Sequence, residues 1–471
     1  MGDLLEHDAL SLSGMLARKE LSAVELMQAT LAQITAWNPR VNAIVSAIDP
    51  DQALALAAKA DNAKRMGWLH GIPVAIKDLA NAQGLETSMG SPVFAGQVAQ
   101  ADDLYVARMR AAGALIIGKT NVPEFGLGSH TFNPVHGATV NPYDPGRSAG
   151  GSSGGAAAAL ATRMLAIADG SDMMGSLRNP AAWCNVYGLR PTWGRIPNEP
   201  TGDMYLHPLA TNGPMGRSPA DIAALLEVQA GRDPVQPFGV AHNNVSRGLD
   251  APIQGMRIGW LADWGGAYPM EDGIVQRCDA ALQVFRDLGA VVEHLAPPFP
   301  ASKIWDSWQV LRWFAVAAKL EPLYRQEKTR AQLKPAAIWE IENGLALSAM
   351  QVQRASALRS EWFRAAAVMF EQFDAVVLPT AQVWPFPVDD IHPTRINGQP
   401  MDTYHRWMEV VVPASLIGLP ALSVPVGFGV NGLPMGMQLI GAARADNTVL
   451  HLGQAYHQAT LWPQKMPPRQ P

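Results

Sequence analysis

One stretch of small residues constrains this chain more than any other part of its sequence. Residues 148–155 read Ser-Ala-Gly-Gly-Ser-Ser-Gly-Gly, and four alanines at 156–159 follow at once. Glycine admits backbone conformations that are closed to other residues, and small side chains let backbone segments approach each other closely. Because an alanine-rich run favours a helix, the pattern predicts a tight turn that opens a helix rather than a flexible linker. Backbone N–H groups at such a turn can bind an anion or an oxyanion.

The rest of the chain alternates between strand-like and helix-like segments. Ser22 with Glu25 predicts a capping box, followed by a helix that Pro39 ends. Short apolar runs predict strands, with a hairpin turn at 431–432 between the last two. The predicted strands are 72–76, 114–117, 165–168, 256–261, 290–293, 375–378, 422–426 and 435–440, and the further predicted helices are 51–66, 272–288 and 446–456. The alternation indicates an α/β fold. Since no linker interrupts it, we expect one domain over 1–471 that begins with a helical segment over about 1–66.

Composition and charge exclude several classes of protein. Charged residues make up 16 % of the chain, and 36 Lys plus Arg against 41 Asp plus Glu give a formal net charge of −5, so no nucleic-acid partner is expected. No apolar run reaches the about 18 residues of a membrane span, and residues 1–8 lack the basic start of a signal peptide. We therefore expect a cytoplasmic protein without a membrane partner. Cys184 and Cys278 belong to no Cys/His cluster, so neither a disulfide scaffold nor a metal site is expected.

A second interpretation of the glycine-rich stretch is the nucleophile turn of an α/β-hydrolase. Gly150–Gly154 satisfies the G-x-S-x-G pattern, with the nucleophile at Ser152 or Ser153 and a distant histidine such as His405 or His451. That turn requires a strand directly before the serine, whereas the preceding residues read as a turn. The α/β-hydrolase therefore stays an alternative.

Two further clusters carry reactive residue types. Residues 170–181 follow a predicted strand, and a strand that leads into a small-residue turn with a serine is how a nucleophile is presented. Lys77 ends the apolar strand in 71–78, and such a lysine is either a surface residue or a desolvated base with a lowered pKa. No histidine lies in the three clusters. A neutral lysine is therefore the base that is available to activate a serine.

Together the three clusters resemble the amidase signature family. Residues 71–78 are similar to the family's lysine strand, 141–155 to its glycine-serine stretch and 170–181 to its nucleophile block. Ser152 and Ser176 have the spacing of the family's two catalytic serines. The resemblance implies a mixed twisted β-sheet covered by helices on both faces. It also implies an amidase that acts on linear amides without a metal or cofactor, as a monomer or homodimer.

The resemblance further implies a mechanism. Lys77, kept neutral by burial, would take a proton from Ser152, which would take one from the nucleophile Ser176. A cis peptide bond would join Gly151 to Ser152. The other implied site residues are the oxyanion-hole N–H groups of Met173, Met174, Gly175 and Ser176, and the supporting residues Ser153, Asp172 and Arg178.

Signals for the substrate are fewer. The family usually has two glycines before the nucleophile, and here the first is Met174, so we expect its side chain to restrict substrate size and slow turnover. The resemblance is weakest over about 234–368, the family's variable substrate funnel, which contains Trp305 and Trp308. Met89 aligns with a loop near the family's acyl site. We expect these residues to contact a hydrophobic or aromatic amide, as in an aryl acylamidase, and also esters or aryl carbamates, as in a urethanase.

Two other functions are compatible with the same clusters. The family includes the glutaminase subunit of a tRNA-dependent amidotransferase, which requires partner chains. A catalytically silent binding protein, in which Met174 has closed the site, is the other.

Overall fold

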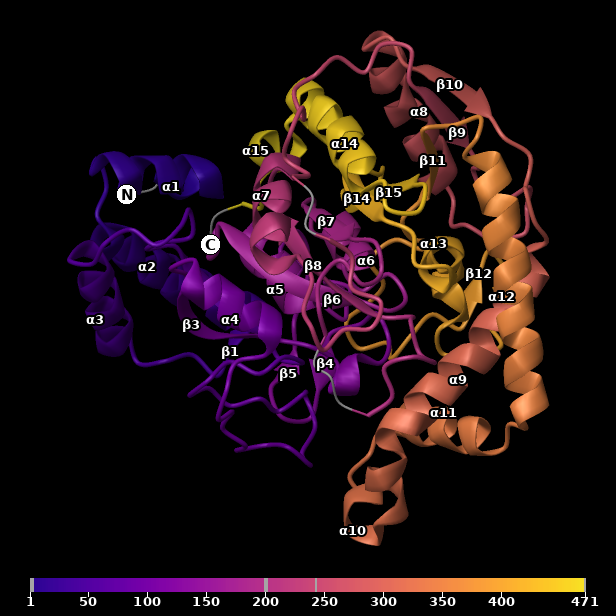
Figure 1. Cartoon of the computed structure of the whole chain (residues 1–471), viewed down its shortest axis with the longest axis horizontal. Coiled ribbons are helices and arrows are strands. Elements are labelled where there is room, and N and C mark those ends of the chain that lie inside the picture. Colours follow the sequence, from indigo (N-terminus) through magenta and orange to yellow (C-terminus); the bar gives the residue numbers. More distant parts are fainter. Residues whose placement is uncertain (1–3, 199–201, 242–243, 470–471) are drawn as a thin grey trace.

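The computed structural model describes residues 4–198, 202–241 and 244–469, and an eight-stranded mixed sheet lies at its centre (Figure 1). The strand order is β10-β9-β11-β15-β14-β7-β8-β6. The pairs β10–β9 and β9–β11 are parallel, and the other neighbours are antiparallel. The strands are β6 (Ile167–Asp172), β7 (Tyr187–Arg190), β8 (Thr211–Gly216), β9 (Arg257–Trp260), β10 (Val291–His294), β11 (Ala375–Pro379), β14 (Ala421–Phe428) and β15 (Pro434–Gly441).

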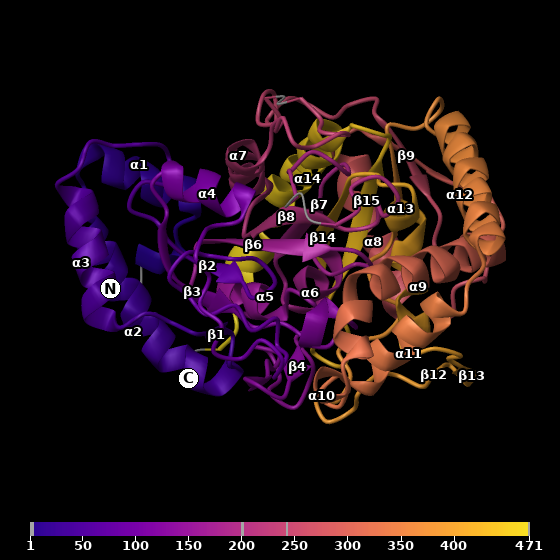
Figure 2. The same cartoon turned by 60° about the horizontal axis from the view of Figure 1, so that its bottom comes forward.

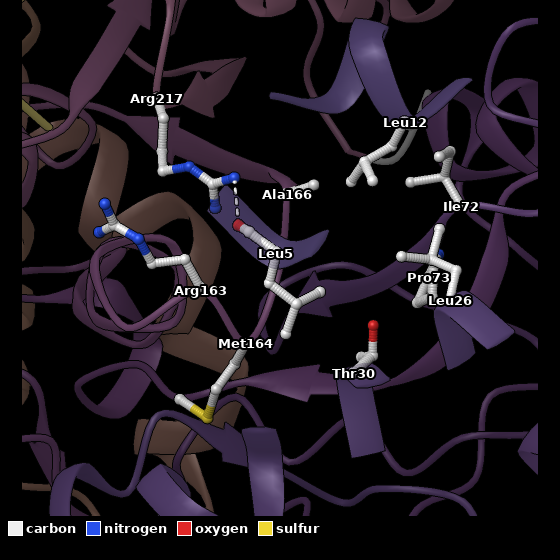
Figure 3. Close-up of a pocket in the computed structure, with 10 residues that line it drawn as sticks. All are labelled: Leu5, Leu12, Leu26, Thr30, Ile72, Pro73, Arg163, Met164, Ala166 and Arg217. Atoms are coloured by element: carbon white, nitrogen blue, oxygen red, sulfur yellow. Dashed lines mark hydrogen bonds between the residues drawn. The ribbon is translucent and has the colours of Figure 1, made fainter. Parts of the chain in front are cut away.

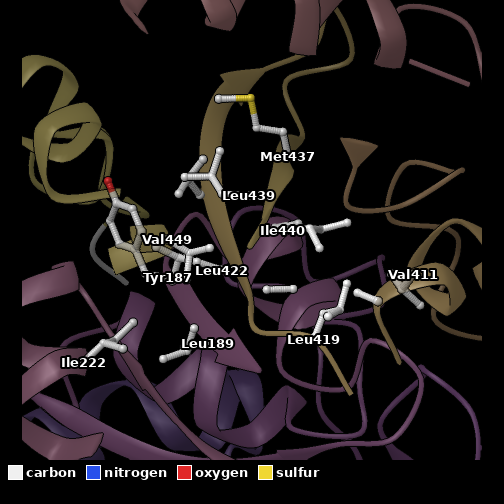
Figure 4. Packing of buried hydrophobic residues seen from close by; sticks show 14 of the residues in the cluster. Tyr187, Leu189, Ile222, Val411, Leu419, Leu422, Met437, Leu439, Ile440 and Val449 are labelled. Carbon is white, nitrogen blue, oxygen red and sulfur yellow. The ribbon is translucent and has the colours of Figure 1, made fainter. Parts of the chain in front are cut away.

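Helices cover both faces of this sheet, and its central strands are accordingly apolar on both sides. Leu422 of β14 pairs with Leu439 of β15, and both lie on the face covered by α14, where Figure 4 shows them with Val449. Gly436 is three residues from Leu439 and so lies on the opposite face, where it contacts Ala182 of α6. The α/β class, the mixed sheet and the two covered faces are confirmed.

The α-helices alternate with the strands along the chain. They are α1 (Ala9–Arg18), α2 (Ala23–Val41), α3 (Pro50–Asp61), α4 (Leu104–Ala111), α5 (Gly154–Ala161), α6 (Arg178–Trp183), α7 (Pro219–Gln229), α8 (Ile274–Asp287), α9 (Ala301–Arg325), α10 (Glu327–Arg330), α11 (Pro335–Leu345), α12 (Ala349–Met369), α13 (Val412–Leu416), α14 (Asp446–Thr460) and α15 (Trp462–Lys465). Short 3₁₀ turns are η1 (Leu4–Glu6), η2 (Glu124–Gly126) and η3 (Arg406–Val411).

A second, three-stranded sheet in the order β1-β3-β2 positions Lys77. Its strands are β1 (Ile44–Val45), β2 (Pro73–Lys77) and β3 (Leu115–Thr120), and two short hairpins are β4 (Phe132–Asn133) with β5 (Gly137–Ala138) and β12 (Arg395–Ile396) with β13 (Gln399–Pro400). β2 runs parallel to β3, and all five of its residues are buried. Lys77 is the last residue of β2, so its side chain starts from a rigid, dry position.

The N-terminal helices show two differences from the predicted bounds. The capping box at Ser22 and Glu25 is present, but α2 continues through Pro39 to Val41. The side chain of Asn38 accepts the N–H groups of Ala43 and Ile44 and thereby stabilises this last turn. The next predicted helix, 51–66, ends early at Asp61, because Asn62 Nδ2 donates to Ala58 O and caps the helix there.

Buried arginines attach the N-terminal segment to the sheet. Arg217 Nη2 donates to Leu5 O at 2.9 Å (Figure 3). Arg163 Nη2 lies 3.0 Å from Glu6 Oε2. Figures 1 and 2 place α1–α3 at one end of the molecule and the helices α9, α11 and α12 at the other. The segment 234–368, which the sequence predicts as the variable substrate funnel, therefore includes this helical layer as well as β9, α8 and β10.

Candidate active site

The ammonium group of Lys77 lies among serine oxygens. Lys77 is 1 % exposed, and its Nζ is 2.9 Å from Ser152 Oγ and 2.7 Å from Ser153 Oγ. Ser171 supplies two more acceptors, its Oγ at 3.0 Å and its carbonyl oxygen at 3.1 Å. The lysine strand (71–78), the glycine-serine stretch (141–155) and the nucleophile block (170–181) thus meet around one nitrogen atom.

Burial changes the protonation of this lysine. It lowers the pKa of Lys77 from 10.5 to about 7, while the charges of Asp169 and Asp172 act in the opposite direction. No carboxylate accepts a hydrogen bond from Nζ in the described part of the chain. Near neutral pH a large fraction of the Lys77 side chain is therefore uncharged and can accept a proton from a hydroxyl group.

The glycine-serine stretch is a turn that leads into α5, as predicted. The Gly151–Ser152 peptide bond is cis, and Ser129 Oγ donates to Gly151 O at 2.5 Å. Gly150 has a φ of +78°, and a Cβ there would lie 2.8 Å from Pro180 Cα, so both conformation and space require glycine. No named strand leads directly into Ser152, in contrast to the α/β-hydrolase turn.

Ser176, the serine of the block 170–181, lies in a turn that Asp172, the last residue of β6, holds through its carboxylate. Asp172 Oδ1 accepts the Gly175 N–H at 2.8 Å, and Oδ2 accepts the Leu177 N–H at 3.2 Å. The Ser176 carbonyl oxygen accepts the Ser153 N–H at 3.2 Å, which joins this turn to the glycine-serine turn. No hydrogen bond joins Ser176 Oγ to Ser152 Oγ within the described ranges.

Two buried arginines hold Asp172. Arg178 donates to both carboxylate oxygens, at 3.0 and 3.1 Å, and Arg190 Nη1 lies 3.3 Å from Oδ1. Burial raises the pKa of Asp172, but the two guanidinium groups outweigh it and hold this pKa well below its usual range. Arg178 also donates to Gln438 Oε1 at 2.6 Å and to Ser415 Oγ at 2.7 Å. The turn is thereby attached to β15 and α13, far away in sequence.

The backbone N–H groups of the predicted oxyanion hole divide into two kinds. The N–H of Gly175, which has a φ of +80°, donates to Asp172 Oδ1, so its predicted part in the oxyanion hole would require it to exchange or share this acceptor. Among the described residues, the N–H groups of Met173, Met174 and Ser176 donate to no protein acceptor. Met174 is not among the residues with positive φ, so methionine is unstrained there, and its side chain is 2 % exposed.

A cavity of about 460 Å³ borders the glycine-serine turn through Ser129. Much of its wall is aromatic or apolar, and its ionisable members are Lys334, His130, His392, Asp402 and Tyr404. The lining residues are Leu127, Gly128, Ser129, His130, Phe132, Lys334, Pro335, Ala336, Trp339, Ile391, His392, Asp402, Thr403, Tyr404 and Trp407. Such a lining suits an apolar or aromatic group.

Three of the predicted substrate contacts, Trp305, Trp308 and Met89, do not line this cavity. Trp305 and Trp308 are 3 % and 0 % exposed and do not line this cavity, because their faces pack inside the helical layer; Trp339 lines it instead. Met89 is half-buried, and its carbonyl oxygen accepts the N–H of Phe125 at 2.8 Å.

The two histidines of the α/β-hydrolase alternative lie elsewhere. His405 is fully buried in an aromatic cluster with Trp305 and Tyr404, and His451 Nε2 lies 2.6 Å from Ala251 O. Neither contacts Ser152 or Ser153 among the interactions of the described residues.

Comparison with known proteins identifies the family. The family model described as Amidase matches residues 25–450. The chain belongs to the amidase family. An acylamidase from Rhodococcus erythropolis is 32 % identical over 98 % of this chain and 96 % of its own length. A glutamyl-tRNA(Gln) amidotransferase subunit from Thermosynechococcus vestitus is 35 % identical over 96 % of this chain and 98 % of its own. The crystal structure of a bacterial aryl acylamidase of the amidase signature family has a TM-score of 0.92 and 29 % identity, and covers 99 % of both chains.

The resemblance read from the three clusters is thus confirmed, and the protein is an amidohydrolase of the amidase signature type. No helix in the described ranges is long and apolar enough to cross a membrane. Within the same ranges, no group of three or more His, Cys, Asp or Glu side chains could hold a metal ion.

Sequence reasoning missed four residues that shape the site of this amidase. Ser171 lies in the block 170–181 together with Ser176, so its position in that block could have indicated a role in the site. The Asp169 carboxylate accepts a hydrogen bond from the backbone N–H of Lys77 at 3.0 Å and one from the Tyr105 hydroxyl at 2.7 Å. Asp169, Tyr105 and Arg190 carry no local pattern, because their role depends on contacts between distant segments.

Proposed function

We propose that this amidase cleaves carboxylic amides through an acyl-enzyme on Ser176, with Ser152 as proton relay and Lys77 as base. The observation that carries the proposal is the 2.9 Å contact between Lys77 Nζ, whose pKa burial lowers to about 7, and Ser152 Oγ. A serine hydroxyl is a weak nucleophile until a neighbouring base takes its proton. A neutral lysine at this distance is such a base.

The reaction has two balanced halves. Ser176 Oγ attacks the amide carbon while its proton passes to Ser152 Oγ, and the proton of Ser152 passes to Lys77 Nζ. The C–N bond then breaks, and the returning proton leaves with the amine. In the second half, water attacks the ester of Ser176 and gives up a proton along the same path, which releases the carboxylic acid and restores the serine.

The Asp172 turn supports the transition state in this proposal. Since Asp172 holds the Gly175 and Leu177 N–H groups, the backbone around Ser176 is fixed. The N–H groups of Met173, Met174 and Ser176 are the donors available to the oxyanion, and one such donor typically contributes about 10²–10³ in rate. Ser153 helps to hold Lys77 Nζ in place.

The lining of the 460 Å³ cavity supports a hydrophobic or aromatic substrate. Trp339, Tyr404 and Phe132 offer ring faces to an acyl or aryl group. The name of the aryl acylamidase relative specifies an aryl amide, and that of the acylamidase relative an acyl amide. We extend the proposal to esters and aryl carbamates, because the same attack on a carbonyl carbon applies to them.

A second candidate is the glutaminase component of an amidotransferase, which the 35 % identity to the glutamyl-tRNA(Gln) amidotransferase relative favours. The two candidates differ in substrate and in the need for partner chains. We propose that this chain acts alone, as a monomer or homodimer.

Labelling with a fluorophosphonate, followed by peptide mass spectrometry, tests the proposal. We expect the adduct on Ser176 and its loss in Lys77→Ala, and we expect the purified chain to hydrolyse 4-nitroacetanilide faster than glutamine. An adduct on Ser152 or Ser153 would assign the nucleophile elsewhere. Faster hydrolysis of glutamine would favour the amidotransferase function.

A further inference from the structure

A second cavity, of about 440 Å³, lies apart from the catalytic turns and shares no lining residue with the first. It is formed where the segment after β7, the end of α13 with the residues that follow it, and the segment after β15 meet helix α12. Its lining residues are Thr192, Trp193, Pro208, Arg359, Ser360, Phe363, Arg364, Leu416, Ile417, Gly418, Ala443 and Arg444. The volume is within the range of small-molecule sites.

The charges on this cavity are all of one sign. Arg359, Arg364 and Arg444 line it, and no Asp or Glu does. The one side-chain partner of Arg359 is Ser356 Oγ, at 3.3 Å, and the guanidinium groups of Arg364 and Arg444 make no ion pair or hydrogen bond within the described residues. Elsewhere in the fold, Arg195 and Arg406 are paired with carboxylates at 2.6 and 2.9 Å. Three arginines whose guanidinium groups have no carboxylate partner among the described residues therefore line one cavity.

The rest of the wall is apolar. Trp193 and Phe363 supply aromatic surface, and Phe363 is 44 % exposed although it is a large apolar side chain. Leu416, Ile417 and Pro208 add aliphatic surface. A simple inorganic anion would use the arginines and leave this surface in water, whereas an anion with an apolar body would cover both.

We propose that this cavity is a second ligand site, which binds a small aromatic carboxylate through the guanidinium groups of Arg359, Arg364 and Arg444. The planar guanidinium donates two parallel N–H groups to a carboxylate and also packs against an aromatic ring. The ring of the ligand lies against Trp193 and Phe363. The proposal does not depend on the catalytic mechanism, because none of these residues belongs to the catalytic turns.

Isothermal titration calorimetry with benzoate tests the site directly. We expect saturable binding to the full chain, and a Kd weakened about tenfold or more in Arg359→Ala/Arg364→Ala, since each charge-assisted bond contributes on this scale. Arg354→Ala, on an exposed part of the same helix, is the matched control and leaves the Kd unchanged. Benzamide, which has the same ring but no charge, does not bind measurably.

Several outcomes would overturn the proposal. Benzoate binding that is absent in the full chain, or equal in the double variant, removes the arginines as its anchor and assigns any binding to the first cavity. An affinity for inorganic phosphate equal to that for benzoate would show that Trp193 and Phe363 contribute nothing to binding. If the double variant has a lower Tm, the single variant Arg444→Ala, on an exposed segment, gives the same decision.

Discussion

Asp172 Oδ1 accepts the backbone N–H of Gly175 at 2.8 Å, so the last residue of a strand holds the turn that carries Ser176. Both carboxylate oxygens of Asp172 also accept from Arg178, with all of these groups fully buried. The position of the proposed nucleophile therefore depends on a fully buried charged network. This relationship makes the turn sensitive to the charge of one side chain.

Asp172→Asn tests that dependence. The amide has the size of the carboxylate but leaves Arg178 and Arg190 without a buried counter-charge, so we expect the free energy of unfolding to fall by about 3–5 kcal/mol. We also expect a lower kcat, because the Gly175 and Leu177 N–H groups lose a charged acceptor. Urea denaturation and initial rates measure both. Asp306→Asn, at an exposed position, is the control and changes neither.

The pH profile tests Lys77. The base must be uncharged, and burial lowers its pKa from 10.5 to about 7. Because deprotonation increases with pH, kcat/KM for an uncharged amide should rise through pH 7 and level off above it. Lys77→Arg keeps the charge at every accessible pH and should reduce kcat by about 10²–10⁴. Lys59→Arg, on an exposed helical position, should leave the profile unchanged; an unaltered profile in Lys77→Arg would remove the lysine as base.

Met174→Gly tests the substitution before the nucleophile. The Met174 side chain is buried beside the turn, so its removal should enlarge the acyl side of the site. We expect kcat/KM for a bulky acyl amide to rise about tenfold relative to a small one, a change typical of a few methylene groups in a pocket. The free energy of unfolding should fall by about 2–5 kcal/mol, since buried apolar volume is lost. Identical kinetics on both substrates would contradict the role of Met174.

A pair of tryptophan variants distinguishes the cavity from the core. Trp339 lines the cavity, whereas Trp308 is fully buried and does not. We expect Trp339→Ala to raise KM for aryl amides about tenfold with little loss of stability. Trp308→Ala should lower the free energy of unfolding by about 3–5 kcal/mol and leave the ratio of KM values for aryl and alkyl amides unchanged. The reverse pattern would restore Trp308 as a substrate contact.

Much of the fold could be predicted because its causes are local. The predicted strand 435–440 and hairpin turn at 431–432 correspond to β15 and to the turn before it, since apolar runs and Asn-Gly turns act over a few residues. The capping box at Ser22 was found for the same reason. Element ends were less well predicted: Pro39 lies within α2, because the Asn38 side chain stabilises a last turn that a proline rule alone would remove.

The sequence by itself determined which reactive groups the chain has and in which turns they lie: Lys77 at the end of an apolar strand, Ser152 after two glycines, and Ser176 after Gly175. Local chemistry of the backbone is enough for that. Only the tertiary structure decided three further points. Burial lowers the pKa of Lys77 to about 7, Asp172 accepts the Gly175 N–H, and Trp305 and Trp308 are core residues. Desolvation and ion pairing depend on every segment packed around a group, and Arg190, Ser415 and Gln438 reach this site from positions that no local pattern connects to it.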